Sequence, residues 1–237
     1  MFKTLSFLIR VFIFLILNEK KYWKVKALTK ENKIAEKDAL LEKTAKSFAD
    51  VVLSAARLEL VVEGAENLPP KGTPVVFTPN HGSYFDIPIM IAAVPGIVGF
   101  VSKPENAKIP FIGKWIKESY SVYIDRSSAA NAIEGLRSGA EILKRGHRQV
   151  IFPEGTRSRD GKLQSFKPGS YKLAKMSNSL VIPVAICGAH QIVQKSGKIN
   201  TLTIRVKFFK ALDSNLNTVE MARNAETSIS EYVEKYI

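Results

Sequence analysis

The stretch that decides the fold reads Val75-Val76-Phe77, then Asn80-His81-Gly82-Ser83-Tyr84-Phe85-Asp86, then Ile87-Pro88-Ile89-Met90-Ile91. The first run is short and apolar and predicts a strand, and the last run predicts a helix. His81 therefore lies where a strand ends, and Asp86 lies where a helix begins. A turn that folds the two together would give a general base and the carboxylate that orients it.

Each of these residues also has an ordinary explanation. A lone histidine is more often a satisfied core or surface residue, and Asp86 could simply cap the following helix. Ser83, between them, invites a Ser-His-Asp arrangement, but the Gly-x-Ser-x-Gly pattern of a nucleophile elbow is absent. The sequence therefore does not predict a covalent acyl-serine intermediate.

Outward from this stretch, strands alternate with helices. Short apolar or alternating runs predict strands at 57–64, 74–79, 98–102, 121–124, 149–152, 180–187 and 202–208. Helices are predicted at 87–93, after 109–113, at 129–143, at 172–176 and from Asn217, which forms a capping box with Glu220. This order predicts an α/β fold over residues 57–237, with a mainly parallel central sheet flanked by helices. Pro183 predicts that its strand is bent or lies at an edge.

The predicted strand ends collect polar residues. Four strands end, in order, at Asn80-His81, at Lys103, at Asp125-Arg126 and at Glu154-Gly155-Thr156-Arg157. Chemistry in parallel sheets gathers at the carboxyl ends of the strands. The basic residues among these could each be an ordinary surface charge. Together with nearby glycines they predict a rim that binds an oxyanion.

The N-terminal 56 residues have a different pattern. Residues 5–17 are apolar around Arg10 and have about half the length of a bilayer span, and the flank 18–26 mixes lysines with Tyr22 and Trp23. A signal peptide would need small residues at a cleavage site, and a full span would need more length. A helix that dips into one leaflet is favoured over a buried core helix. Residues 31–56 predict an amphipathic helix, so residues 1–56 are expected to form a two-helix interfacial membrane motif.

The composition indicates which kinds of molecule the protein is expected to bind. The net charge is +13, from 35 Lys+Arg and 22 Asp+Glu, which favours an anionic partner. No nucleic-acid-binding motif accompanies this charge, so an anionic membrane surface is expected and nucleic acid is not. Cys187 is the only cysteine, which excludes an intrachain disulfide, and the three histidines lack metal-ligand spacing, so no metal is predicted.

Four blocks of the sequence resemble the four motifs of the glycerolipid acyltransferases in order and spacing. The first and third match almost letter for letter, and the likeness covers residues 57–212. Within that family it is strongest to the bacterial 1-acyl-glycerol-3-phosphate acyltransferases, which make phosphatidic acid. The blocks are Asn80-His81 with Asp86; Lys103, Ile109-Pro110-Phe111-Ile112-Gly113 and Tyr123-Ile124-Asp125-Arg126; Phe152-Pro153-Glu154-Gly155-Thr156-Arg157-Ser158; and Val181-Ile182-Pro183-Val184.

The resemblance implies a reaction. His81 would remove a proton from the sn-2 hydroxyl of lysophosphatidic acid, with Asp86 orienting it, and the oxygen would attack the thioester of an acyl donor directly. The donor would be acyl carrier protein or acyl-CoA loaded with the chain, and no further cofactor is implied. The compact bacterial members suggest a location at the cytoplasmic face of the bacterial inner membrane, held by the N-terminal helices.

The resemblance also implies which residues bind the acceptor. Positions tied to its glycerol phosphate are Arg126, Glu154, Gly155, Thr156 and Arg157. The two arginines would hold the phosphate, whereas Glu154, itself an anion, is expected to brace an arginine or the loop. Lys103 is a candidate for a phosphate or oxyanion contact. Two alternatives remain: the same fold acting on another lysolipid or on glycerol-3-phosphate, and a non-catalytic peripheral membrane protein.

Overall fold

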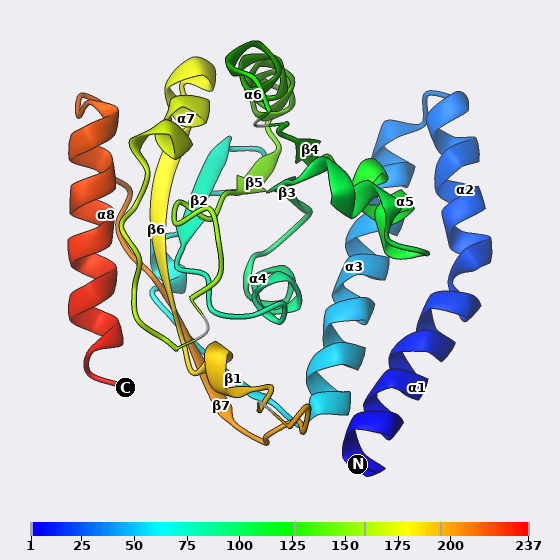
Figure 1. The fold of residues 1–237 in the computed structure, drawn as a ribbon. Coiled ribbons are helices and arrows are strands. Elements are labelled where there is room, and N and C mark those ends of the chain that lie inside the picture. The colour runs from blue at the N-terminus through cyan, green and yellow to red at the C-terminus, as the bar shows by residue number, and fades with distance from the viewer. Residues whose placement is uncertain (1, 126, 159, 195, 237) are drawn as a thin grey trace.

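A seven-stranded sheet runs through the centre of the molecule in this computed structural model, which describes residues 2–125, 127–158, 160–194 and 196–236 (Figure 1). The strand order is β1-β7-β6-β2-β5-β3-β4. Neighbours from β6 to β4 are all parallel, whereas β7 is antiparallel to β6 and carries β1 parallel to itself. The predicted mainly parallel α/β sheet is therefore confirmed. The strands are β1 (Glu59–Glu63), β2 (Val75–Pro79), β3 (Val98–Ser102), β4 (Val122–Tyr123), β5 (Arg148–Val150), β6 (Leu180–Cys187) and β7 (Thr203–Phe208).

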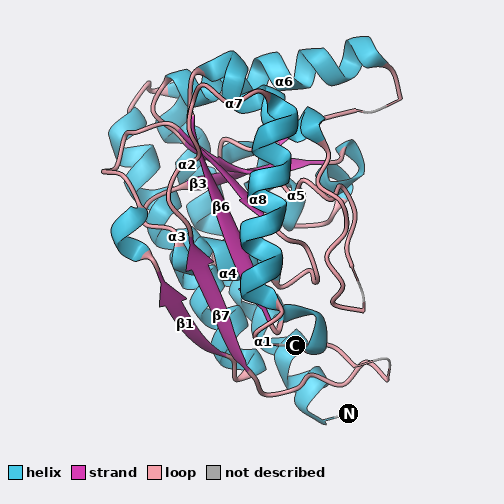
Figure 2. Cartoon of the chain, turned by 90° about the vertical axis from the view of Figure 1, so that its left-hand side faces the viewer, coloured by secondary structure: helices cyan, strands magenta, loops and turns pink. Residues whose placement is uncertain are grey.

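Helices cover both faces of the sheet (Figures 1 and 2). Because strand side chains alternate, Val75 and Phe77 enter a core that α3 and α4 cover, and Val76 enters a second core beneath α6, α7 and α8. β2 is buried along its whole length, which explains its near-continuous apolar sequence. The helices are α1 (Phe2–Leu17), α2 (Glu19–Lys30), α3 (Ile34–Ala56), α4 (Asp86–Ala93), α5 (Ile112–Glu118), α6 (Ala129–Lys144), α7 (Lys172–Ser177) and α8 (Thr218–Val233).

The N-terminal segment differs from its prediction. Residues 2–56 form three helices, α1, α2 and α3, where two were expected. The basic flank continues as helix α2, because the backbone N–H of Tyr22 donates to the carbonyl of Asn18 and carries the helical hydrogen bonds past the end of α1. Val25 and Leu28, three positions apart, then bury one face of α2.

Helix α1 packs on the α/β domain and on α3. Its Phe7 lies 5.6 Å from Phe85 and its Phe12 lies 6.2 Å from Phe111, between ring centroids, and Phe14 lies 5.9 Å from Phe48 of α3. Seven large apolar side chains of α1 are nevertheless 48–71% exposed: Leu5, Leu8, Ile9, Phe12, Ile13, Ile16 and Leu17. No helix in the described ranges combines the length and apolar content needed to cross a membrane.

Pro183 does not mark an edge, so of the two predicted alternatives, a bent strand or an edge strand, the edge is wrong. β6 lies between β2 and β7. The carbonyl of Pro183 accepts from the backbone N–H of Phe209, so both the carbonyl and the nitrogen of Pro183 face the side of β6 on which β7 lies. Pro183 lies just beyond the last pair of the β6–β7 ladder, Val184 with Phe208. A missing N–H is tolerated there because β7 has already ended.

The C-terminal helix begins as predicted. Asn217 accepts from the backbone N–H groups of Val219 and Glu220, and Glu220 accepts in return from the N–H of Asn217. Met221, Ala225 and Ile229 are buried on one face. α8 therefore closes the second core over β6 (Figure 2), and its last residue, Val233, lines the pocket described next.

Candidate functional site

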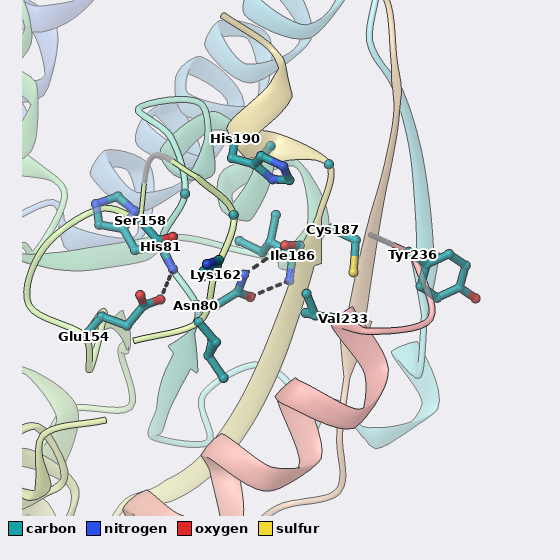
Figure 3. A pocket seen from close by; sticks show the side chains of 15 residues that line it. Asn80, His81, Glu154, Ser158, Lys162, Ile186, Cys187, His190, Val233 and Tyr236 are labelled. Atoms are coloured by element: carbon teal, nitrogen blue, oxygen red, sulfur yellow. Dashed lines mark hydrogen bonds between the residues drawn. The ribbon is translucent and has the colours of Figure 1, made fainter. Parts of the chain in front are cut away.

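Asn80 ties the end of β2 to the end of β6. Its side-chain Nδ2 donates to the carbonyl of Ile186 at 3.0 Å, and its Oδ1 accepts from the N–H of the same residue at 2.7 Å (Figure 3). Both polar groups of one β6 residue are thus satisfied by one amide. The clamp sets the direction in which the chain leaves β2 and so positions His81.

His81 and Asp86 are brought together as the spacing predicts. The Nδ1 atom of His81 lies 2.7 Å from Oδ2 of Asp86, and the same oxygen accepts from the backbone N–H groups of Gly82 and Ser83, both at 2.9 Å. The side chain of Asp86 is fully buried. It does not cap α4, since its hydrogen bonds go to the preceding loop. Because Asp86 accepts at Nδ1, that nitrogen carries the proton and Nε2 presents a lone pair.

The ring of Phe152 also holds the imidazole of His81 in place. The two rings stack, with centroids 3.9 Å apart and planes inclined by 21°. About 17% of the His81 side chain is exposed. Nε2 has no hydrogen-bond partner within the described ranges of the chain. A nitrogen with a free lone pair, in a fixed ring at the surface of a pocket, can accept a proton from a bound hydroxyl.

Glu154 braces the loop, one of the two roles expected for it. Its carboxylate is 2% exposed and accepts from the backbone N–H of His81 at 2.6 Å and from that of Gln164 at 3.1 Å (Figure 3). The carbonyl of His81 accepts in turn from the N–H of Ser158. Burial raises the pKa of Glu154 to about 7, although the hydrogen bonds from His81 and Gln164 oppose this rise. The loops after β2 and β5 are thereby fastened to each other.

Arg157 lies on the exposed ring of Tyr84. The centre of its guanidinium is 3.5 Å from the ring centroid, and Nη2 donates to the Tyr84 hydroxyl at 2.9 Å. This cation–π contact connects the loop after β5 to the loop after β2 a second time. Ser83 is a turn residue, because its hydroxyl accepts from the N–H of Phe85 at 3.3 Å.

The remaining sequence-predicted residues are less closely grouped. Lys103 is exposed at the end of β3, which is separated from β2 by β5. Arg126 lies outside the described residues. Gly155 adopts a positive φ of 74° in a turn whose N–H donates to Phe152, and Thr156 is exposed beside it.

A small pocket opens next to His81 (Figure 3). Its volume is ≈ 20 Å³, room for about one water molecule. Lys162 and His190 line it with His81, and Arg157 and Lys103 do not. The imidazole of His190 fits against Gly161, where a Cβ atom would come within 2.7 Å of the ring.

Sequence reasoning missed several of these residues. Phe152 was seen as the end of a strand and the start of the third motif block but was given no role, and His190 and Lys162 carry no local motif. Glycines at 82 and 161 are the one available signal, because both lie against His190. That signal could not be read without knowing that the segments are neighbours.

An apolar pocket lies on the other side of α4. Its volume is ≈ 120 Å³, and α1, α3, α4 and α5 enclose it. Ile87 and Ile91 of α4 face it together with Ala45 and Phe48 of α3. No group of three or more His, Cys, Asp or Glu side chains among the described residues is arranged to hold a metal ion.

Comparison with known proteins gives related sequences. A chloroplast 1-acyl-sn-glycerol-3-phosphate acyltransferase of Arabidopsis thaliana is 33% identical over 172 residues, which are 72% of this chain and 48% of that protein. The 1-acyl-sn-glycerol-3-phosphate acyltransferase of Saccharomyces cerevisiae is 31% identical over 77% of this chain and 61% of its own length. The chain thus spans about half the length of the first curated relatives it matches.

The architecture has a solved counterpart. The crystal structure of the 1-acyl-sn-glycerophosphate acyltransferase of Thermotoga maritima is similar with a TM-score of 0.84 and 27% identity, over 99% of this chain and 94% of that one. A family model described as Acyltransferase matches residues 59–187 of the 237. That range begins at β1 and ends at β6, and contains the loops of His81 and Glu154. On this match, the chain belongs to the Acyltransferase family.

Proposed function

We propose that this protein transfers an acyl chain from a thioester donor to the sn-2 hydroxyl of lysophosphatidic acid and so forms phosphatidic acid. The observation that carries the proposal is the 2.7 Å contact between His81 Nδ1 and the buried carboxylate of Asp86. It leaves Nε2 of His81 free to act as a base. The names of the related proteins support lysophosphatidic acid as the acceptor.

The proposed reaction is a direct transfer. Nε2 of His81 takes the proton of the acceptor hydroxyl while the hydroxyl oxygen attacks the thioester carbonyl carbon. Asp86 stabilises the imidazolium that forms, because an opposite charge at hydrogen-bond distance in a buried site favours the charged ring. The carbon–sulfur bond then breaks, and the leaving thiolate takes the proton from His81. No covalent acyl-enzyme is needed, consistent with the turn role of Ser83.

The two ends of the acceptor require different surroundings. Its phosphate suits the basic residues at the strand ends, Arg157 and Lys103 among them, with the backbone of Gly155 and Thr156 beside Arg157. An acyl chain suits the apolar pocket behind α4, the helix that starts at Asp86. The pocket at His81 has a volume of ≈ 20 Å³, room for about one water molecule, so it does not hold a whole acceptor headgroup.

Membrane association is part of the proposal. The exposed apolar face of α1 supports an interfacial helix, with exposed Lys20 and Lys24 of α2 following it. An anionic membrane surface and the cytoplasmic face of a bacterial inner membrane remain proposals on this basis. The donor, acyl carrier protein or acyl-CoA, is distinguished by supplying each in turn and following thiol release.

The first prediction concerns the base. His81→Ala should lower the rate of thiol release with lysophosphatidic acid by about 10²–10⁴-fold, the usual contribution of a positioned general base. Ser83→Ala is the matched control in the same loop and should retain most of the activity. Near-normal turnover in His81→Ala, or acyl label left on Ser83 after denaturation, would contradict the mechanism.

The second prediction concerns the acceptor. Arg157→Ala should raise the KM for lysophosphatidic acid about tenfold or more, because a charge-assisted contact to phosphate is lost, with kcat little changed. A phosphate-free monoacylglycerol should show no such rise. Arg137→Ala, which removes one exposed charge from α6, is the control. Equal KM changes for both acceptors would argue against a phosphate role for Arg157.

The third prediction concerns the pH dependence of stability. The pKa of Glu154 rises from 4.5 to about 7 on folding, so folding favours its protonated form. Its contribution to stability is therefore complete below about pH 4.5 and is lost as the pH rises through 7. Between these values the wild type should lose up to about 3 kcal/mol more than Glu154→Gln, measured by urea unfolding. Identical pH slopes for the two proteins would refute the assignment.

A further inference from the structure

A third pocket, remote from His81 in sequence, is lined by positively charged side chains. It lies between the start of α1, the end of α3 and the loop before β7, and its volume is ≈ 170 Å³. Lys3, Arg10 and Arg57 line it, with hydroxyls from Ser6 and Thr201, and no acidic residue is among the lining residues that the structure describes. None of the three cations takes part in an ion pair within the described ranges.

The pocket is held in place by the fold. The hydroxyl of Thr4 donates to the carbonyl of Gly197 at 3.1 Å and fastens the start of α1 to the loop before β7. Three unpaired cations around one pocket repel one another, which costs electrostatic free energy. A bound anion attracts all three, so its binding there is electrostatically favourable. Guanidinium and ammonium groups with nearby hydroxyls match the acceptor oxygens of a phosphate group.

Arg57 gives an independent indication. It ends α3 in the left-handed conformation, with φ 56° and ψ 45°. Glycine or asparagine is the usual residue at such a position, and a long side chain there is strained. A strained arginine whose side chain lines a basic pocket points to a role for the guanidinium rather than for the turn.

The neighbouring surface identifies the kind of molecule that carries the phosphate. Lys3, Ser6 and Arg10 follow one another at spacings of three and four and form one stripe of α1. That stripe runs beside the exposed apolar stripe that begins at Leu5 and continues to Leu17. A phosphate in the pocket therefore has apolar surface next to it, suited to acyl chains, which a free phosphate ion would not use.

We infer that this pocket binds the phosphate of an anionic phospholipid, at a site separate from the acceptor site at His81. The bound lipid stays intact: it orients the protein on the membrane by fastening α1 and the end of α3 to one headgroup. The inference rests on the proposed membrane association and specifies where one lipid is held. Figure 1 shows the start of α1 and the end of α3 at the same end of the molecule, with α6 at the opposite end.

The test compares full-length variants on vesicles of phosphatidylcholine alone or mixed with phosphatidylglycerol. Arg57→Gly relieves the left-handed strain, so its Tm should stay equal or rise, while its partition to the anionic vesicles should fall about fivefold, the effect of one lost cation near the surface. Arg10→Gln should weaken partition similarly without touching the turn. Arg137→Ala on α6, at the opposite end of the molecule (Figure 1), is the control and should lose less than Arg57→Gly.

Several results would overturn the inference. Equal losses in Arg57→Gly and Arg137→Ala would mean that diffuse surface charge, not this pocket, attracts the membrane. A lower Tm in Arg57→Gly with unchanged partition would make Arg57 structural. If inorganic phosphate alone raises the wild-type Tm as much as anionic vesicles do, the pocket is a free-phosphate site.

The same experiment separates this inference from the proposed function. If the wild type binds no anionic vesicles, membrane association itself is wrong and this inference falls with it. If the wild type binds them and Arg57→Gly binds equally well, only this inference fails. Thiol release with lysophosphatidic acid is measured separately in detergent, and its absence would contradict the proposed reaction without affecting the vesicle comparison.

Discussion

The site depends on one buried carboxylate. Oδ2 of Asp86 accepts from the ring of His81 and from the backbone N–H groups of Gly82 and Ser83, in a side chain with no exposure. Three donors on one oxygen offset the cost of burying the charge. Oδ1 finds no partner among the described residues, so the negative charge is not fully neutralised by hydrogen bonds. Such a carboxylate favours a proton on His81 Nδ1 and stabilises the ring when it gains a second proton at Nε2.

The parallel sheet positions the loops that form this arrangement. β2 and β5 are neighbours, so the loops after them leave the same edge of the sheet side by side. Glu154, from the second loop, holds the backbone of His81, and Phe152 supports its ring. Asn80 fastens the first loop to β6 on the other side. Each contact comes from a residue within four positions of a strand end.

Local sequence patterns predicted much of the fold and of the site at His81. The strands, the capping box at Asn217 and the approach of His81 to Asp86 are confirmed, because each depends on residues close together in the chain. The family resemblance, which rests on the order of four blocks along the chain, is confirmed as well. Predictions that needed tertiary context were weaker. An edge position was one of two alternatives predicted from Pro183, because its lost N–H was judged without knowing where β7 ends. Helix α2 was missed because its lysines resembled a membrane flank. The roles of Phe152, His190 and Glu154 depend on loops after different strands, which sequence spacing does not relate.

Asp86→Asn tests the central claim most directly. The amide has nearly the same size and can still accept a hydrogen bond, but it carries no charge to stabilise the imidazolium or to select its tautomer. The measurement is kcat for thiol release with lysophosphatidic acid, together with the Tm of the variant. The account predicts a fall in kcat of about 10²-fold or more, with the KM values little changed and the fold retained. A folded Asp86→Asn protein with wild-type kcat would contradict it.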